Sequence, residues 1–211
     1  MDTPRLTIVD HPIVRRDLTV LRRLGTPHGT FRATLSSISM HLAYECLRDL
    51  PVSEVTIETP LEQTLGHELR GSVVVIPILR AGLGLVDGVL RLIPDARVGH
   101  LGMYRDEESF EPVSYYERTP RFIDSARVLV VDPMLATGGS AEGAISILKE
   151  RGAKDIQFMC LVAAPEGVLR LNKAHPDVPI FTAALDRELD ENAYIRPGLG
   201  DAGDRIFGTQ D

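Results

Sequence analysis

An acid, two hydroxyl residues and two glycines follow directly on a strongly apolar stretch of this chain. Residues 128–131 read Val-Leu-Val-Val, Asp132 comes next, and residues 137–140 read Thr-Gly-Gly-Ser. The β-branched run predicts the end of a buried strand, and residues 141–151 predict a helix. Free backbone N–H groups at a helix N-terminus lie in the positive end of its dipole and bind phosphate. The pattern favours a phosphate-monoester site over the alternative, an ordinary strand–turn–helix junction capped by Ser140.

A second candidate ligand loop follows another apolar stretch. Residues 73–79 read Val-Val-Val-Ile-Pro-Ile-Leu, and Arg80 leads into Ala-Gly-Leu-Gly at 81–84. The planar guanidinium of an arginine beside small residues suits a diphosphate, because it donates two parallel hydrogen bonds. A surface arginine in a tight turn is supported equally well by the local sequence.

Alternating elements are expected to position these loops. Apolar periodicity, Pro and Gly punctuation and a capping-box pattern at Thr59 predict the elements. We expect helices at 12–24, 29–50, from 59 onward, 85–92, 141–151 and 165–174, and strands at 52–58, 73–79, 97–104, 128–131, 156–164 and 180–184. Alternation of this kind predicts an α/β fold with a mainly parallel sheet covered on both faces, and a single domain over 1–211.

Composition narrows the class of protein. The chain has 211 residues, 44% hydrophobic and 25% charged, with a net charge of −7. A general nucleic-acid binder would present a basic face, so the charge opposes that class. The sequence contains neither an apolar run of membrane-spanning length nor a signal-peptide pattern at its start, which predicts a cytoplasmic protein without membrane partners. Cys46 and Cys160 stand in apolar patterns and are expected to be buried, reduced thiols.

Two long motifs resemble one enzyme family. The run from Asp132 to Ser140, Asp-Pro-Met-Leu-Ala-Thr-Gly-Gly-Ser, resembles the 5-phosphoribosyl 1-diphosphate (PRPP) motif of type I phosphoribosyltransferases. Asp-Pro-Met in place of two adjacent acids is typical of the uracil phosphoribosyltransferases. Residues 194–208 are similar to the uracil-binding segment of the same family. The resemblance spans nearly the whole chain and implies the type I phosphoribosyltransferase fold, with an N-terminal helical region, a protruding arm and a C-terminal base-binding segment.

The resemblance also assigns roles to residues. The implied catalytic residues are Arg80, Arg105 and Asp201. The implied PRPP-binding residues are Arg80, Arg105, Asp132, Pro133, Met134, Leu135, Ala136, Thr137, Gly138, Gly139, Ser140 and Asp201, and the implied uracil-binding residues are Ile195, Gly200, Asp201 and Ala202. Because Pro133 cannot ligate a metal, we assign no protein ligand to Mg²⁺ and expect it to bind through PRPP or diphosphate and water.

The activity implied is transfer of phosphoribose from PRPP to uracil, giving UMP and diphosphate. Some family members are activated by GTP, and a homodimer or higher homo-oligomer is implied. Residues 104–122, rich in aromatics and acids, form either a plain surface excursion or an arm or flap that contacts a partner subunit or closes over substrate, and the resemblance favours the arm. Arg196 lies beside the base-reading residues and either alters base affinity or points to solvent. Two alternatives remain: an RNA-binding pyrimidine-operon regulator of the same fold, and a phosphoribosyltransferase for another base.

Overall fold

The computed structural model describes residues 5–105 and 112–209, apart from the side chains of residues 104, 105 and 112. Its helices are α1 (Pro12–Arg22), α2 (His28–Cys46), α3 (Leu83–Leu92), α4 (Gly139–Glu150), α5 (Pro165–Ala174) and α6 (Ala202–Phe207), with a 3₁₀ turn at Ile123–Ser125. Its strands are β1 (Leu6–Ile8), β2 (Val52–Glu58), β3 (Gln63–Leu69), β4 (Val73–Leu79), β5 (Arg97–Val98), β6 (His100–Arg105), β7 (Pro112–Arg118), β8 (Arg127–Val131), β9 (Met134–Leu135), β10 (Asp155–Ala163), β11 (Ile180–Leu185), β12 (Glu188–Leu189) and β13 (Ile195–Arg196).

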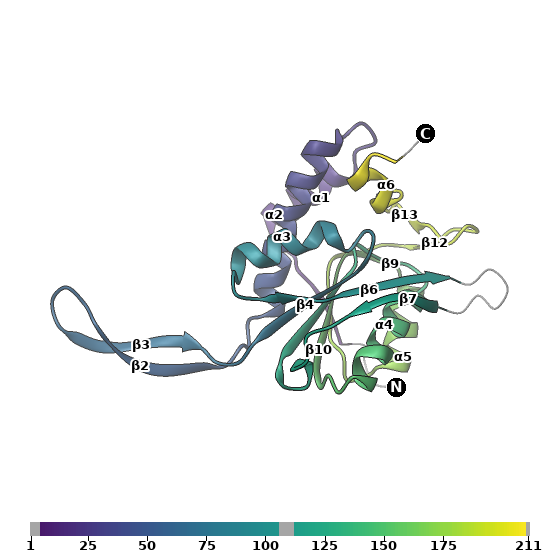
Figure 1. The fold of residues 1–211 in the computed structure, drawn as a ribbon. Helices are drawn as coiled ribbons and strands as arrows, with labels where there is room; N and C mark the ends of the chain where they lie inside the picture. Colours follow the sequence, from purple (N-terminus) through teal and green to yellow (C-terminus); the bar gives the residue numbers. More distant parts are fainter. Residues whose placement is uncertain (1–4, 106–111, 210–211) are drawn as a thin grey trace.

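A mainly parallel sheet forms the centre of the molecule (Figure 1). The strand order is β1-β11-β10-β8-β4-β6-β7, with β5 beside β4 and β9 beside β10. Within this sheet the β6–β7 pair is antiparallel and the other pairs are parallel. The predicted fold class is therefore confirmed. The carboxyl ends of β4, β8 and β10 meet at one edge, which is where parallel α/β sheets bind ligands.

Helices cover both faces because successive strand residues point to opposite sides. On β8, Leu129 and Val131 face one apolar core, and Val128 and Val130 face the other. The first core is closed by apolar side chains of α1, α2, α3 and α6. The second core is closed by α4 and α5. Within the described ranges, none of the helices has both the length and the apolar character needed to cross a membrane.

Most predicted elements form within a few residues of their expected bounds, but the helix predicted from Thr59 is wrong. The Thr59 hydroxyl accepts the N–H groups of Leu61 at 3.2 Å and Glu62 at 3.0 Å, as a helix cap would. The Glu62 carbonyl then accepts the Thr59 N–H at 3.0 Å, which closes a turn. The chain therefore reverses and pairs β3 antiparallel with β2. A capping pattern begins hairpin turns as well as helices, and strand pairing decided the outcome.

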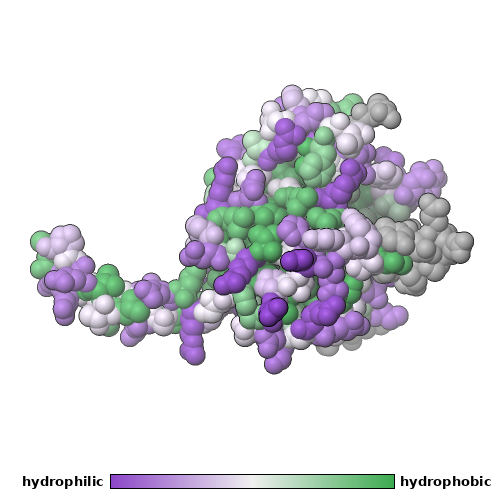
Figure 2. Space-filling model, viewed as in Figure 1, coloured by the Kyte–Doolittle hydropathy of each residue, from purple (hydrophilic) through white to green (hydrophobic). Residues whose placement is uncertain are grey.

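The β2–β3 hairpin projects away from the body of the molecule (Figure 1). Val52, Leu65 and Leu69 lie on one face of it, since Val52 pairs with Leu69 and Leu65 stands four residues before Leu69. Their side chains are 54%, 62% and 57% exposed. Figure 2 shows apolar residues distributed along the length of this hairpin.

Part of the segment expected to form an arm or flap, 104–122, forms regular strand structure instead of a loop. β7 pairs antiparallel with β6 and extends the sheet at its edge. Residues 106–111, between these two strands, lie outside the described ranges. The predicted strand over 97–104 is split into β5 and β6 at Gly99, where a Cβ atom would lie 2.5 Å from Ile76 Cδ1.

Candidate active site

The phosphate-loop candidate lies between β8 and α4. Asp132 follows the last residue of β8, β9 pairs briefly with β10, and residues 136–138 turn into α4. Gly138 has φ +82° and is the N-cap residue of α4, and Ser140 is the second residue of the helix with an exposed side chain. The N-cap alternative for Ser140 is therefore wrong. Asp132 and residues 134–141 line a small hollow at this edge of the sheet.

Close contacts with α5 fix the shape of this loop. A Cβ atom on Gly138 would lie 2.9 Å from the Gly167 carbonyl oxygen, and one on Gly167 would lie 2.4 Å from the Ala136 carbonyl oxygen. The positive φ of Gly138 is a second reason for glycine at this position. The backbone carbonyls of Pro133 and Leu135 attach the loop to β10 and the residue after it. The Pro133 carbonyl accepts the Leu161 N–H at 2.9 Å, and the Leu135 carbonyl accepts the Ala164 N–H at 2.9 Å.

Asp132 is partly buried with few polar partners. Within the described structure, its carboxylate accepts one long hydrogen bond, from the Met134 N–H at 3.4 Å. Burial raises the pKa of Asp132 to about 7, and the Met134 N–H offsets this only in part. A carboxylate with unused acceptor capacity at the mouth of a phosphate loop suits hydroxyl groups of a sugar.

Arg80 extends from the loop after β4, the strand that pairs with β8. A Cβ atom on Gly82 would lie 2.5 Å from the Val131 carbonyl oxygen, so this loop packs directly on the end of β8. The Leu79–Arg80 peptide is cis. The Arg80 side chain is 61% exposed and points toward α6, with its guanidinium 3.8 Å from the Asp204 carboxylate. Its cation centre lies 5.9 Å from the Phe207 ring centre.

Arg105 ends β6, which pairs with β4, so its backbone lies at the same edge of the sheet. Its predicted contact with diphosphate concerns a side chain outside the described part of the chain. No group of three His, Cys, Asp or Glu side chains placed to hold a metal ion occurs among the described residues.

The C-terminal segment folds over this edge. Ile195 and Ala202 are buried, and Gly200 is exposed with φ +76°. Asp201 is the N-cap of α6 and accepts the Asp204 N–H at 2.9 Å. The Arg80 guanidinium lies 4.0 Å from where a Gly203 Cβ would stand, which brings the second ligand loop against this segment. The Arg196 side chain is 57% exposed, as the solvent alternative expects, and forms an ion pair with Asp190 at 2.5 Å.

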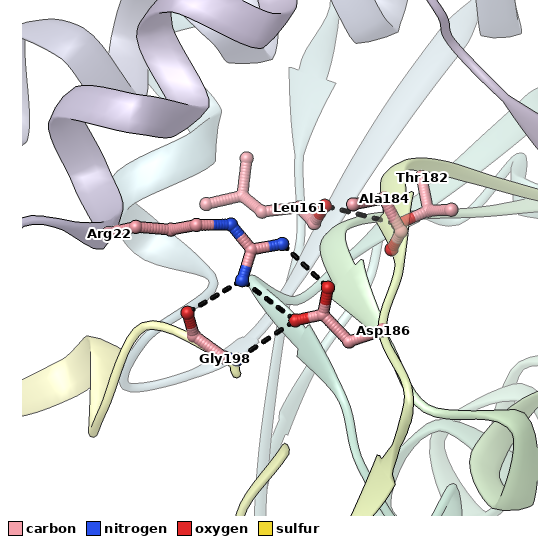
Figure 3. Close-up of polar contacts among 6 residues, drawn as sticks. All are labelled: Arg22, Leu161, Thr182, Ala184, Asp186 and Gly198. Carbon is pink, nitrogen blue, oxygen red and sulfur yellow. Dashed lines mark hydrogen bonds and ion pairs between the residues drawn. The ribbon is translucent and has the colours of Figure 1, made fainter. Parts of the chain in front are cut away.

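Three residues that support this segment escaped sequence reasoning. Arg22 and Asp186 form a partly buried ion pair that binds Gly198 (Figure 3). Arg205 is buried and donates to the Leu199 carbonyl at 2.8 Å. Asp186 follows β11 as Asp132 follows β8, so an acid after a strand was a usable signal. Arg22 and Arg205 carried no local signal.

Arg170 of α5 also lies beside the phosphate-loop candidate. Its Nη1 atom is 3.4 Å from where a Gly139 Cβ would stand, and its Nε forms an ion pair with Glu142 in the first turn of α4. No sequence pattern singled out Arg170.

Comparison with known proteins identifies the family. The family model described as uracil phosphoribosyltransferase matches residues 8–209. The chain belongs to the uracil phosphoribosyltransferase family. It is 64% identical to the uracil phosphoribosyltransferase of Salinibacter ruber over 206 residues, covering 98% of each chain. It is 55% identical to that of Streptococcus pneumoniae over 207 residues, covering 98% of this chain and 99% of the relative.

Two solved structures are similar to this chain in fold. The AQ2163 protein of Aquifex aeolicus is similar over 97% of this chain and 99% of its own, with a TM-score of 0.92 and 34% identity. The adenine phosphoribosyl transferase of Trypanosoma brucei is similar over 90% of this chain and 88% of its own, with a TM-score of 0.56 and 13% identity. The second likeness shows that the fold is that of the type I phosphoribosyltransferases.

Proposed function

We propose that this member of the uracil phosphoribosyltransferase family transfers phosphoribose from PRPP to uracil, giving UMP and diphosphate in pyrimidine salvage. The observation that carries the proposal is the convergence of three segments at the carboxyl edge of the sheet. Gly82 packs on Val131 at the base of the 132–140 loop, and Arg80 lies beside Gly203 in the C-terminal segment. These are the segments that the family resemblance assigns to diphosphate, sugar phosphate and base.

Each segment is proposed to hold one part of the substrates. Backbone N–H groups and hydroxyls of residues 136–140 would bind the 5′-phosphate in the positive end of the α4 dipole. Asp132 would accept hydrogen bonds from the ribose hydroxyls. Residues 195 and 200–202 would present backbone groups to the acceptor–donor–acceptor edge of uracil, which rejects cytosine because its amine leaves those groups unpaired.

The chemistry is a displacement at the anomeric carbon. The C1′–N1 bond to uracil forms as the C1′–O bond to diphosphate breaks, and the N1 proton of uracil passes to solvent. Positive charge from Arg80 and Arg105 stabilises the departing diphosphate, and the loops orient the base. Arg80 has rotational freedom for this, since its described ion pair with Asp204 is long and the side chain is mostly exposed.

Magnesium is proposed to accompany PRPP. Pro133 occupies the position next to Asp132 where a second acid would stand, so diphosphate oxygens and water would hold the ion. The partly buried Asp132 carboxylate, short of hydrogen-bond partners, fits a neighbourhood with added positive charge. When bound, the ion supplies charge that neutralises diphosphate.

The proposal is tested by following UMP formation from uracil, PRPP and Mg²⁺, with cytosine and the purine bases in parallel. Turnover with uracil alone is expected. Turnover with a different base would contradict the base assignment while keeping the phosphate site. Absence of turnover with every base, together with tight binding of a pyrimidine-operon leader RNA, would support the regulator instead.

We further propose that the protein is a cytoplasmic homo-oligomer. The exposed apolar face of the β2–β3 hairpin, formed by Val52, Leu65 and Leu69, supports association, because isolated hairpins with apolar faces need a partner surface. Cys46 and Cys160 are buried free thiols, which suits a reducing compartment. Activation by GTP rests on the family resemblance alone, and measuring initial rates across a GTP titration tests it.

A further inference from the structure

A partly buried ion pair between Arg22 and Asp186 forms hydrogen bonds with the backbone of Gly198 in the C-terminal segment. Arg22 donates to both carboxylate oxygens of Asp186, at 2.6 and 2.8 Å, and to the Gly198 carbonyl at 2.7 Å. Asp186 in turn accepts the Gly198 N–H at 2.9 Å. The two side chains are 24% and 5% exposed. Figure 3 shows Arg22 reaching from α1 to meet Asp186 and Gly198 at one point.

Gly198 lies between the two parts of the proposed base site, Ile195 and residues 200–202. It stands between Ile195 and Gly200, has φ +59°, and a Cβ atom there would lie 2.1 Å from the Ile195 carbonyl oxygen. Both backbone polar groups of this residue are bound by the ion pair. The ion pair therefore sets the position of Ile195 relative to residues 200–202.

The Arg22–Asp186 ion pair, called the clamp below, is attached to the central sheet and to α6. The Asp186 N–H donates to the Ala163 carbonyl at 2.8 Å, which ties the acid to the end of β10. The Thr182 hydroxyl donates to the carbonyls of Leu161 and Ala184 and holds the end of β11 (Figure 3). On the helix side, Arg205 donates to the carbonyls of Leu21 and Arg23, on either side of Arg22.

We propose that Arg22 and Asp186 are positioning residues for base recognition, which hold the backbone of 195–202 in register with the edge of uracil. Neither side chain needs to touch the base. This inference rests on the proposed assignment of uracil to that segment. It assigns to the end of α1, more than 170 residues away in sequence, a part in choosing the base.

Comparing arginine with lysine at position 22 distinguishes a positioning role from simple charge pairing, because only the planar guanidinium donates in two fixed directions. A buried ion pair alone is weak grounds for a stability role, since its desolvation offsets its attraction. Lysine keeps the charge but lacks the planar fork, so it cannot satisfy both oxygens of Asp186 and the Gly198 carbonyl together. Arg22→Lys therefore loosens the clamp without leaving an unpaired buried charge.

The test is steady-state kinetics of Arg22→Lys and Asp186→Asn with uracil and PRPP varied separately, alongside thermal melting. Arg187→Gln is the matched control, because Arg187 neighbours Asp186 but forms an exposed ion pair with Glu188. We expect the KM for uracil to rise about tenfold or more, with KM for PRPP within about twofold, since small misplacements of binding groups cost that much. The discrimination against cytosine should fall, and the control should match the unsubstituted protein.

A KM for uracil within about twofold of the unsubstituted value in folded Arg22→Lys would overturn the proposal. So would a lower melting temperature with both KM values unchanged, which marks a purely structural pair. If Asp186→Asn fails to fold, Arg22→Lys carries the test alone. Failure of the unsubstituted protein to use uracil contradicts the proposed function, and the same variants are then measured with the base that it does use.

Discussion

At the scale of single residues, Asp132 lies in the candidate site, in surroundings that disfavour its charged form. Its carboxylate lies at the mouth of the phosphate-loop candidate with one long hydrogen bond, and its pKa is raised to about 7. In the unfolded chain the same group has a pKa near 3.8. Folding without ligand therefore costs free energy once the carboxyl ionises, and the ribose hydroxyls proposed to bind here would recover part of that cost.

This environment makes the stability of the ligand-free protein depend on pH. As pH rises from about 4 to 7, the unfolded chain loses this proton before the folded protein does, so folded stability falls. We expect Asp132→Asn to be more stable than the unsubstituted protein by about 1–3 kcal/mol at pH 8. The difference should shrink toward pH 4, and UMP formation should be severely reduced. Urea unfolding at pH 5 and pH 8 measures this, and an identical difference at both pH values would contradict it.

Arg170 neutralises Glu142 in the first turn of α4, beside the loop proposed to bind phosphate. Removing the cation leaves a carboxylate near the incoming phosphate, at a cost of about 1 kcal/mol, or about fivefold in binding. We expect Arg170→Gln to raise the KM for PRPP by about that factor and leave the KM for uracil unchanged. Lys173→Gln, on the exposed side of the same helix, is the control. Equal KM values for PRPP in the two variants would rule out this role.

Residue types and order predicted the loops that meet at the carboxyl edge of the sheet, but not the contacts that hold them. That these loops bind the substrates stays a prediction. The acid after an apolar strand and the glycine pair located the 132–140 loop from sequence alone. Arg22 and Arg205 could not be singled out from sequence. Arg22 binds Asp186 and the Gly198 carbonyl, and Arg205 binds the Leu21 and Arg23 carbonyls, all more than 160 residues away in the chain. Long-range contacts of that kind leave no local periodicity.

At the scale of elements, the turn into α4 depends on the absence of a side chain at Gly138. A side chain there would meet the Gly167 carbonyl and would need a left-handed backbone, which costs about 1–3 kcal/mol. We expect Gly138→Ala to lower the free energy of unfolding by that amount and to raise the KM for PRPP. Gly25→Ala is the matched control, since no atom lies within 4 Å of its added Cβ. Equal effects of the two substitutions in urea unfolding would disprove the argument.

Elements were predictable where the strand or helix carries its own pattern. β2, β4 and α5 form at the expected residues, because alternation, a continuous apolar run and Pro165 are local signals. β3 was mistaken for a helix, because the capping-box pattern at Thr59 also begins a hairpin turn. β7 was missed because it is specified by pairing with β6 at the sheet edge.

At the scale of the whole molecule, the β2–β3 hairpin is the outlying feature. Its apolar face is expected to be covered in an oligomer. We expect Leu65→Glu with Leu69→Glu to lower the molar mass measured by light scattering after gel filtration, because two charges would be buried in the interface. Leu169→Glu, similarly exposed on α5, is the control. A monomeric unsubstituted protein, or an unchanged mass in the double variant, would contradict the proposed association.

The long-range contacts that hold the C-terminal segment also bear on the order in which the protein folds. The contacts of Arg205 join positions 182 and 184 residues apart, between the end of α1 and α6. During synthesis, the sheet through β11 emerges from the ribosome before the segment proposed to bind the base, and such distant contacts close late in folding. We therefore expect the proposed phosphate loop to fold first, and the proposed base site to form only when α6 has docked against α1.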